Sequence, residues 1–375
     1  MPGKKITVLL TRKEIIMPEK TATILTLDAG GTNLVFSAVQ NHIILKEKVI
    51  LPAPSDDLDT FLGKLKKGFS QLEKKCGTNA DAISFCFPGP ADYDQGIIGD
   101  LENLPFFRGG VPLAKILENE FHIPVFINND GDLFTLGEAI GGLLPEINSK
   151  SRKKYGNLLG VTLGTGFGGG IVTQGKLFAG DNSAAAEINR FSNFLNRTES
   201  VEEVLSIRGL RRLFAEKAHL PFDEAPEPFE IYQIGIGATK GNQLAAQEAW
   251  QHFGLVLGDA LANAVSLTDS CVVIGGGLSG AYPLFLPATI DQMNGYFVKK
   301  DGATLARMEL SVYNWENEKE KDTFLKDASV QIQVPSSGEI LTYTPQKKIA
   351  AGITKLGTSE AVALGAYAFA LSKLK

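Results

Sequence analysis

Asp130 stands where a carboxylate can take part in catalysis. It follows the apolar run PVFIN and precedes a helical stretch that begins near Asp132, so it lies at a strand end that points toward a helix N-terminus. The helix dipole and the nearby backbone N–H groups would keep its carboxylate ionised and fixed. An ionised, oriented aspartate can accept the proton of an attacking hydroxyl in phosphoryl transfer. The same position is also typical of a plain N-cap without a chemical role.

A second aspartate stands beside a glycine turn in the stretch LDAGGTN. Asp28 ends a predicted strand, and Gly30 and Gly31 permit a tight turn with positive φ. Thr32 adds a hydroxyl beside exposed backbone N–H groups. Such a turn can cradle phosphate oxygens, and the Asp28 carboxylate can hold a magnesium ion, directly or through water. The alternative is an ordinary hairpin turn with a solvated aspartate.

A second glycine turn, LGTGFGGG, formally matches the dinucleotide fingerprint GxGxxG. That fingerprint requires a helix directly after the glycines, whereas the following IVTQGKLF predicts a strand and another turn. A dinucleotide site is therefore excluded here. We assign a second phosphate-binding turn to Gly164, Thr165 and Gly166.

A third glycine cluster, VVIGGGLSG, follows another predicted strand, but Pro283 and Pro287 interrupt the segment behind it. It is a weak dinucleotide signal and suits a loop packed against adenine or ribose, formed by Gly275, Gly276 and Gly277. The sequence contains no GxxxxGK[ST] phosphate loop. Two phosphate turns, a nucleoside turn and an aspartate at a strand end between them are the parts of an ATP-dependent kinase.

The elements that must position these groups alternate between strands and helices. From residue 21 the pattern predicts three short strands separated by Gly-Gly and Asn-His turns, which form an antiparallel meander. A helix over 56–76, a strand over 82–87, a helix over 112–122 and a strand over 124–130 follow. The segment 157–180 repeats the meander. We therefore predict an α/β fold with two similar lobes and a ligand-binding cleft between them.

The remaining elements belong to the second half. Helices are predicted over 202–218 and 241–267, with a buried strand over 271–277 and a small-residue helix at the end of the sequence. We place the first lobe at 21–128, closed by the helix 358–375. The second lobe covers 129–357, with an inserted hairpin or small β excursion near 296–348.

The composition narrows the class of protein. The chain has 375 residues, 44% hydrophobic and 21% charged, so it can bury a large core. Its net charge of −5 provides no basic surface for nucleic acid or an anionic membrane. Three widely spaced cysteines encode no disulfide framework, and no apolar run reaches the roughly 18 residues of a membrane span. We expect a soluble, cytoplasmic protein that binds neither nucleic acid nor membrane.

Taken together, the sequence resembles the ROK family of bacterial sugar kinases and repressors. Six segments across residues 22–285 follow the order of the family's motifs, namely LDAGGTNLVFSAV, FPGPAD, NLPFF, INNDGDLFTLGEA, LGTGFGGGIVTQGKLFAG and VIGGGLS. The segment LGTSEAVALGAY resembles the family's C-terminal helix. The resemblance implies an actin-like ATPase (ribonuclease H-like) fold that binds ATP and magnesium in the cleft and phosphorylates a hexose, usually at the 6-hydroxyl. It also implies that the chain can form a homodimer.

The same resemblance implies roles for single residues. Asp130 resembles the general base, and Asn129 resembles a neighbouring sugar ligand. Asn103 in NLPFF and Gly89 in PGP resemble further sugar contacts. The first two glycine clusters correspond to the family's phosphate turns and the third to its adenosine turn.

One stretch, DNSAAAEINRFSNF, departs from the family pattern. The family usually has GExGH here, followed by a cysteine-rich zinc motif. That motif ends in a glutamate three residues before a serine. Glu187 matches the first glutamate, whereas Asn189 and Arg190 replace the glycine and the histidine. The cysteines are gone, and Glu203 stands three residues before Ser206. We therefore expect no zinc site, with Glu187 and Glu203 as sugar-facing acids. Alternatively, Glu187 is solvated and Glu203 belongs only to a helix start.

Three functions stay open. The leading hypothesis is an ATP:hexose 6-phosphotransferase with glucose as the default acceptor. A kinase for mannose, an N-acylhexosamine or fructose would use the same catalytic groups. A non-catalytic sugar sensor or repressor of this family would carry a helix-turn-helix domain in front, whereas about 20 residues precede the first predicted strand here.

Overall fold

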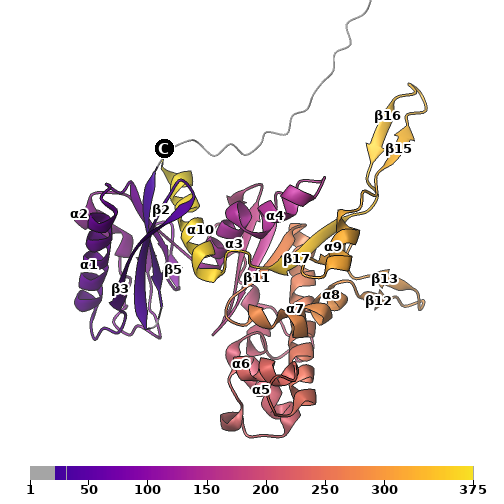
Figure 1. Cartoon of the computed structure of the whole chain (residues 1–375), viewed down its shortest axis with the longest axis horizontal. Coiled ribbons are helices and arrows are strands. Elements are labelled where there is room, and N and C mark those ends of the chain that lie inside the picture. Colours follow the sequence, from indigo (N-terminus) through magenta and orange to yellow (C-terminus); the bar gives the residue numbers. More distant parts are fainter. Residues whose placement is uncertain (1–21, 31, 375) are drawn as a thin grey trace, which may run out of the picture.

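The computed structural model describes residues 22–30 and 32–374 and arranges them in two lobes (Figure 1). One lobe is built on a five-stranded sheet and the other on a six-stranded sheet. Gly31, predicted for the first phosphate turn, lies outside the described residues.

The first sheet has the strand order β3-β2-β1-β4-β7. β1 (Thr23–Ala29), β2 (Asn33–Gln40) and β3 (Ile43–Pro52) form the predicted antiparallel meander. Asn41 and His42 make the β2–β3 turn with positive φ, as tight hairpin turns require. β4 (Ala82–Cys86) and β7 (Val125–Asn128) run parallel to β1. The carboxyl ends of these three strands therefore lie at one edge of the sheet.

Two helices and a short hairpin complete the first lobe. They are α1 (Leu58–Cys76), α2 (Leu113–Phe121) and the pair β5 (Ala91–Asp92) and β6 (Ile97–Ile98). Asp57 caps α1 by accepting a hydrogen bond from the Thr60 amide, and Gly77 ends it in the left-handed conformation. Apolar α1 side chains recur at helical spacing and pack into an aromatic core, namely Phe61, Leu65, Phe69 and Leu72.

The second sheet has the order β10-β9-β8-β11-β17-β14. Its strands are β8 (Leu158–Leu163), β9 (Phe167–Thr173), β10 (Lys176–Leu177), β11 (Cys271–Gly275), β14 (Ser311–Asn314) and β17 (Lys348–Ile353). β8, β9 and β10 form an antiparallel meander, and β11 and β17 are parallel to β8. The two sheets thus share one topology, as the sequence predicts for two similar lobes.

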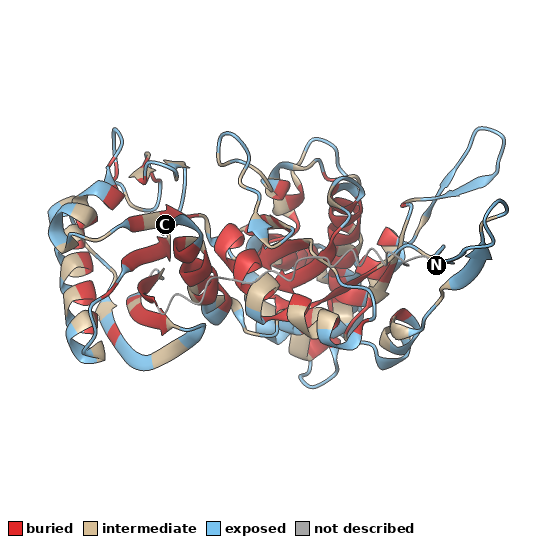
Figure 2. Cartoon of the chain, turned by 90° about the horizontal axis from the view of Figure 1, so that it is seen from above, coloured by how far each residue is buried: buried red, intermediate tan, exposed pale blue. Residues whose placement is uncertain are grey.

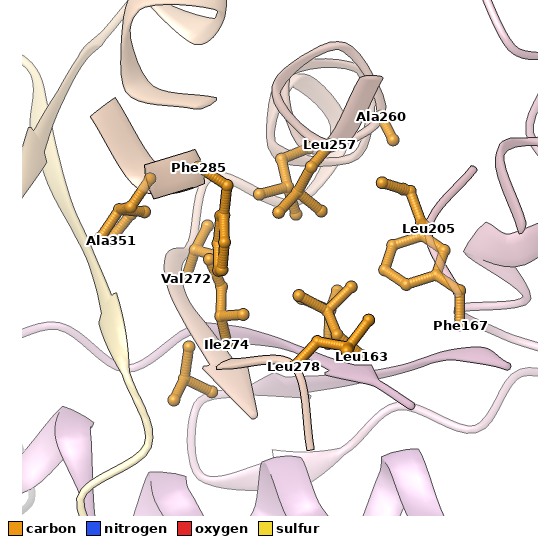
Figure 3. Packing of buried hydrophobic residues seen from close by; sticks show 14 of the residues in the cluster. Leu163, Phe167, Leu205, Leu257, Ala260, Val272, Ile274, Leu278, Phe285 and Ala351 are labelled. Carbon is orange, nitrogen blue, oxygen red and sulfur yellow. The ribbon is translucent and has the colours of Figure 1, made fainter. Parts of the chain in front are cut away.

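Helices complete the second lobe. They are α4 (Leu143–Lys150), α5 (Ile207–Ala218), α6 (Pro228–Gly235), α7 (Gln243–Thr268) and α8 (Tyr282–Met293). Of these, α5 and α6 pack on α7 rather than on the sheet. Figure 3 shows Leu257 of α7 and Phe285 of α8 close to Val272 and Ile274 of β11, and all four are buried. The helix after the third glycine cluster differs from the expectation. Pro283 lies at the start of α8, where no N–H is needed, so it does not prevent the helix.

Two helices join the lobes. α3 (Asp130–Gly141) belongs to the second lobe, whereas α10 (Thr358–Lys373) packs against β1, β2 and β4 of the first. A side chain on Gly137 would overlap the Ala361 carbonyl of α10, and one on Gly365 would overlap the Leu133 carbonyl of α3. Only glycine allows the two backbones to approach this closely. The domain boundaries at 128/129 and 358 stay predictions.

The segment 296–348 differs in part from the predicted insertion. It contains two hairpins, β12 (Tyr296–Val298) with β13 (Thr304–Ala306) and β15 (Val330–Gln333) with β16 (Ile340–Tyr343), which project from the body and are exposed (Figures 1 and 2). Between them, β14 joins the second sheet and α9 (Glu318–Leu325) packs on it. Only the two hairpins are therefore excursions. Within the described ranges, no helix is both long and apolar enough to cross a membrane.

Candidate active site

Three strand ends of the first sheet place Asp28 and Asp130 at the same edge of that sheet. Asp28, Cys86 and Asn128 lie at or near the ends of β1, β4 and β7, which are parallel neighbours. Burial raises the pKa of the Cys86 thiol, and the negative charges of Asp130 and Asp28 raise it further. Both carboxylates therefore lie near the carboxyl edge of the sheet, where α/β proteins bind their ligands.

Asp130 is fixed at the first turn of α3. Asn129 is the N-cap, and its Oδ1 accepts a hydrogen bond from the Gly131 amide at 2.7 Å. Asp130 Oδ1 accepts from the same amide at 2.8 Å. Loss of solvent raises the pKa of the Asp130 carboxyl, while its backbone hydrogen bonds act in the opposite direction. A raised pKa brings a carboxylate closer to the pH at which a general base is most effective.

The glycines of β9 let two segments approach that strand from opposite sides. A Cβ on Gly170 would lie 2.6 Å from Thr135 Oγ1 of α3, whereas one on Gly169 would lie 2.6 Å from Ile188 Cγ2 in the loop beyond β10. Real Cβ atoms do not approach other atoms so closely, so larger residues would push both segments away. The run GGG is therefore a packing requirement that brings Asp130 and Glu187 to one place.

A cavity of about 440 Å³ lies between the start of α3, the second-lobe glycine turns and the loop that leads into a 3₁₀ turn, η1 (Ile188–Arg190). This volume is within the range of small-molecule sites. The predicted residues that line it are Asn129, Asp130, Gly164, Thr165, Gly166, Glu187 and Gly276. The predicted base, one phosphate turn, part of the nucleoside turn and one sugar-facing acid therefore share a single cavity.

The N-terminus of α10 connects this cavity with the first lobe. The Gly276 amide donates to Thr358 Oγ1 at 3.0 Å, and Ser359 Oγ donates to Asp28 Oδ2 at 2.8 Å. The cap residue Gly357 offers no side chain to the first-turn amides. Free amides at a helix N-terminus attract anions such as phosphate. The sequence reasoning missed both hydroxyls, although Thr-Ser directly after a glycine was a helix-start signal.

Other predicted glycines lie outside this cavity. Gly30 and Thr32 form the β1–β2 turn on the first lobe, where the Gly30 amide donates to the Asn33 carbonyl at 3.0 Å. Gly275 packs on α3, because a Cβ there would overlap the ring of Phe134. Gly277 faces open space. The first turn and the rest of the third cluster are thus not part of the cavity lining.

Gly89 and Asn103 belong to first-lobe loops. A Cβ on Gly89 would lie 3.2 Å from Tyr93 Oη, which donates to the Phe87 carbonyl at 2.9 Å. Burial raises the pKa of the Tyr93 phenol, and the charge of Asp130 raises it further, so the Gly89 loop lies near the base. Asn103 is exposed in the loop between β6 and α2 and does not line the cavity.

Glu202, not the predicted Glu203, lines the cavity. Glu202 Oε2 accepts a hydrogen bond from the Phe167 amide at 3.0 Å, beside the second phosphate turn. Glu203 instead pairs with Arg208 at 2.7 Å and with Arg212 at 3.0 Å. The predicted helix over 202–218 begins only at residue 207, and a 3₁₀ turn, η2 (Val201–Glu203), precedes it. The three-residue spacing to the serine could not tell which of two adjacent glutamates this turn directs inward.

The loop around Glu187 provides acceptors rather than a basic group. Glu187 and Asn189 line the cavity, while Arg190 is exposed outside its lining. Asp132, the second aspartate of α3, also lines it and was not predicted as a site residue. The sequence feature that could have identified Asp132 is its position two residues after the predicted base. The sequence could not show that its side chain is buried.

Within the described residues 22–30 and 32–374, no three histidine, cysteine, aspartate or glutamate side chains are grouped so that they could hold a metal ion. Asp28 offers a single carboxylate, one oxygen of which accepts from Ser359. One carboxylate fits the usual way in which magnesium is held beside substrate phosphates, because most of its ligands are then water and phosphate oxygens.

Comparisons with known proteins agree with this geometry. The protein-family model described as "ROK family" matches residues 24–314 of the sequence. The chain is 27% identical over 272 residues to N-acetylgalactosamine kinase AgaK of a Shewanella species, covering 68% of this chain and 81% of that protein. It is 27% identical over 299 residues to a glucokinase of Halalkalibacterium halodurans, covering 74% and 87%.

A solved structure is similar over nearly the whole chain. The glucokinase of Parabacteroides distasonis aligns with a TM-score of 0.86 and 45% sequence identity, covering 96% of this chain and 100% of that one. The similarity therefore extends through both lobes and through the glycine turns that surround the cavity.

Proposed function

The chain belongs to the ROK family, has the actin-like ATPase fold and is a sugar kinase, and on that premise we propose that it transfers the γ-phosphoryl group of ATP to the 6-hydroxyl of a hexose. Glucose is the default acceptor, and Asp130 is the general base. The observation that carries the proposal is that Asp130 shares one cavity with the turn Gly164–Thr165–Gly166. A base and a phosphate-binding turn must meet there if a hydroxyl is to attack a phosphorus atom.

The donor side of the site is assigned to the glycine turns and to α10. Gly164, Thr165 and Gly166 would contact the phosphates from the second lobe, and Gly30 and Thr32 from the first, while the third cluster would contact the nucleoside. Support comes from the α10 N-terminus, whose Thr358 and Ser359 lie between these turns. Asp28 would hold magnesium beside the phosphates, directly or through water.

The acceptor side is assigned to Asn129, Asp130, Glu187 and Glu202. Their oxygen atoms can accept hydrogen bonds from sugar hydroxyls, and charge-assisted bonds of this kind are the strong ones. Glu202 replaces Glu203 in this assignment because it lines the cavity. Gly89 and Asn103 stay proposed contacts from the first lobe, which would have to move toward the sugar.

The proposed chemical step is a direct displacement. Asp130 accepts the proton of the sugar 6-hydroxyl as its oxygen bonds to the γ-phosphorus, and the bond from that phosphorus to ADP breaks. Magnesium and the helix N-terminus would balance the charge that develops on the phosphate oxygens. The products are the sugar phosphate, ADP and a proton that Asp130 returns to solvent.

The identity of the sugar is the finer question, and mannose, an N-acylhexosamine and fructose are alternatives to glucose. The similarity to an N-acetylgalactosamine kinase and to a glucokinase supports both classes. A sensor without turnover is disfavoured, because the base and both kinds of glycine turn are present. A homodimer and a cytoplasmic location stay predictions.

The test is ADP release from ATP and magnesium, coupled to an optical assay, with a panel of glucose, mannose, fructose, N-acetylglucosamine and N-acetylmannosamine. We expect turnover with at least one hexose and the highest kcat/KM for glucose. A higher kcat/KM for another sugar would replace glucose in the proposal. Sugar binding by calorimetry without any ADP release would instead support the sensor.

A further inference from the structure

Asp132 takes no part in the proton transfer proposed above, yet it belongs to the cavity wall. Its side chain is only 4% exposed and lines the cavity. Its Oδ1 atom has no hydrogen-bond partner among the residues that the structure describes. A buried polar atom without a partner costs about 1–3 kcal/mol, and more when it is charged. Folded proteins keep such atoms where a ligand, a water molecule or an ion supplies the missing hydrogen-bond partner.

The charges around Asp132 are all of one sign. Four carboxylates line the cavity, and none of its described lining residues is a lysine, arginine or histidine. Burial and then the charges of Asp130 and Glu187 raise the pKa of Asp132 to about 7. The four lining carboxylates are those of Asp130, Asp132, Glu187 and Glu202. The cavity wall therefore holds four acids that no basic side chain of its own offsets, and a positively charged ligand would favour their ionised forms.

Two buried acceptor oxygens of this wall have no partner among the described residues. Asn189 lines the same cavity, and its Oδ1 is a second buried oxygen for which the described structure shows no partner. The acids are not grouped as metal ligands anywhere in the described ranges. A wall of dispersed acceptors binds a ligand that offers hydrogen-bond donors, and it binds a positively charged donor best.

We propose that Asp132 is a further substrate-contacting residue, and that the cavity accepts a hexose with a free ammonium group as a second substrate while it discriminates against the N-acetylated form. This inference rests on the proposed sugar kinase function. An ammonium group offers three donors and one positive charge. An acetamido group carries no charge, offers one N–H and adds a carbonyl oxygen, to which an ionised carboxylate can donate no hydrogen bond.

The chemistry of phosphoryl transfer is the same for this substrate. The 6-hydroxyl proton moves to Asp130, the oxygen bonds to the γ-phosphorus and ADP leaves, while the ammonium group keeps its protons throughout. Asp132 therefore affects which sugar binds rather than how the phosphoryl group moves. Its removal should act mainly on KM, and selectively on the amino sugar.

The test compares kcat and KM for glucose, glucosamine and N-acetylglucosamine in the wild type and in Asp132→Asn. We expect the wild type to prefer glucosamine to N-acetylglucosamine by roughly tenfold or more in kcat/KM. Asp132→Asn should lose roughly tenfold on glucosamine through KM, and about threefold or less on glucose. The matched control is Asp291→Asn, the same change at an exposed position of α8, which should alter none of these values.

Glu187→Gln provides a second variant that does not depend on tolerance of a buried change, since Glu187 is exposed. It should raise KM for every sugar, because Glu187 also contacts sugar hydroxyls, and should cost the most on glucosamine, where a charge opposite the ammonium group is lost as well. Equal losses on all three sugars in both variants, or no wild-type preference for glucosamine over N-acetylglucosamine, would overturn the inference while leaving the kinase in place. If no sugar is phosphorylated, the proposed function fails instead. Calorimetry then decides the inference, because equal affinities for the two amino-sugar forms contradict it.

Discussion

At the scale of single residues, two of the four cavity carboxylates accept hydrogen bonds from backbone amides rather than from basic side chains. Asp130 accepts from the Gly131 amide and Glu202 from the Phe167 amide. A backbone amide fixes a carboxylate without cancelling its charge, so the carboxylate remains a strong acceptor. A general base and a ligand for sugar hydroxyls both need this property.

The two adjacent glutamates give a direct residue-level prediction. Glu202→Gln should raise the sugar KM roughly tenfold with a smaller change in kcat, because a charge-assisted hydrogen bond of about 1.5–3 kcal/mol is weakened. Glu203→Gln should change KM by less than about twofold, because its partners Arg208 and Arg212 are partly exposed and such pairs contribute little. Steady-state kinetics measure both. The opposite ranking would return Glu203 to the sugar site.

Asp132 predicts a pH dependence of stability. Its pKa is about 7 in the folded protein and 3.8 in an ordinary aspartate. Between these values the folded chain holds a proton that the unfolded chain has released, so stability falls as the pH rises. Asp132→Asn removes this effect and should increase the free energy of unfolding more at about pH 8 than at about pH 5, by at most a few kcal/mol. Denaturant unfolding at the two pH values measures it, and an equal change at both would contradict the prediction.

At the scale of elements, the site depends on how α3 meets its neighbours. Glu138 of α3 is fully buried and accepts hydrogen bonds from Thr354 Oγ1 at 2.6 Å and from the Leu356 amide at 3.0 Å. These contacts join α3 to the segment that leads into α10. Together with the glycine crossing, they fix the helix that presents Asp130 relative to the helix that presents Thr358.

The crossing of α3 and α10 is testable with a pair of glycine substitutions. Gly137→Ala should destabilise the protein by about 1–3 kcal/mol and lower kcat/KM, because the added methyl overlaps the Ala361 carbonyl and separates the helices. Gly63→Ala is the control, since Gly63 lies within α1 and a Cβ there would have nothing within 4 Å. The control should gain up to about 1 kcal/mol. Thermal unfolding compares them, and a neutral Gly137→Ala would show that the crossing is not tight.

The sequence anticipated the site at the level of elements better than at the level of side chains. Short apolar runs separated by turn residues predicted both meanders. The position of Asp130 after β7 was predicted because a local pattern, a strand followed by a helix start, marks it. The choice between Glu202 and Glu203 depends on a three-residue turn that no periodicity reveals. The roles of Asp132 and Thr358 depend on contacts between segments far apart in the chain. Those contacts come from packing, which local patterns do not encode.

At the scale of the whole molecule, the projecting hairpins are separate from the cavity that holds Asp130. In the part of the chain that the structure describes, β15 and β16 pair only with each other, and Figure 2 shows this hairpin as exposed. Its exposed apolar side chains include Val330, Ile332 and Tyr343. We expect that replacing residues 329–345 by a short Gly-Ser linker changes kcat/KM by less than about twofold, because no residue of this hairpin lines the cavity. A loss of tenfold or more would mean that the hairpin contributes to the site.

The proposed mechanism requires that Asp130 accept the proton while other groups bind the sugar. Asp130→Asn keeps the size of the side chain but cannot accept the hydroxyl proton as a carboxylate does. The most direct measurement is the single-turnover rate of sugar phosphorylation in this variant and the wild type, beside the sugar Kd from calorimetry. We predict that the rate falls by at least about a hundredfold while Kd changes by less than about threefold. An unchanged rate would contradict the assignment of Asp130 as the base.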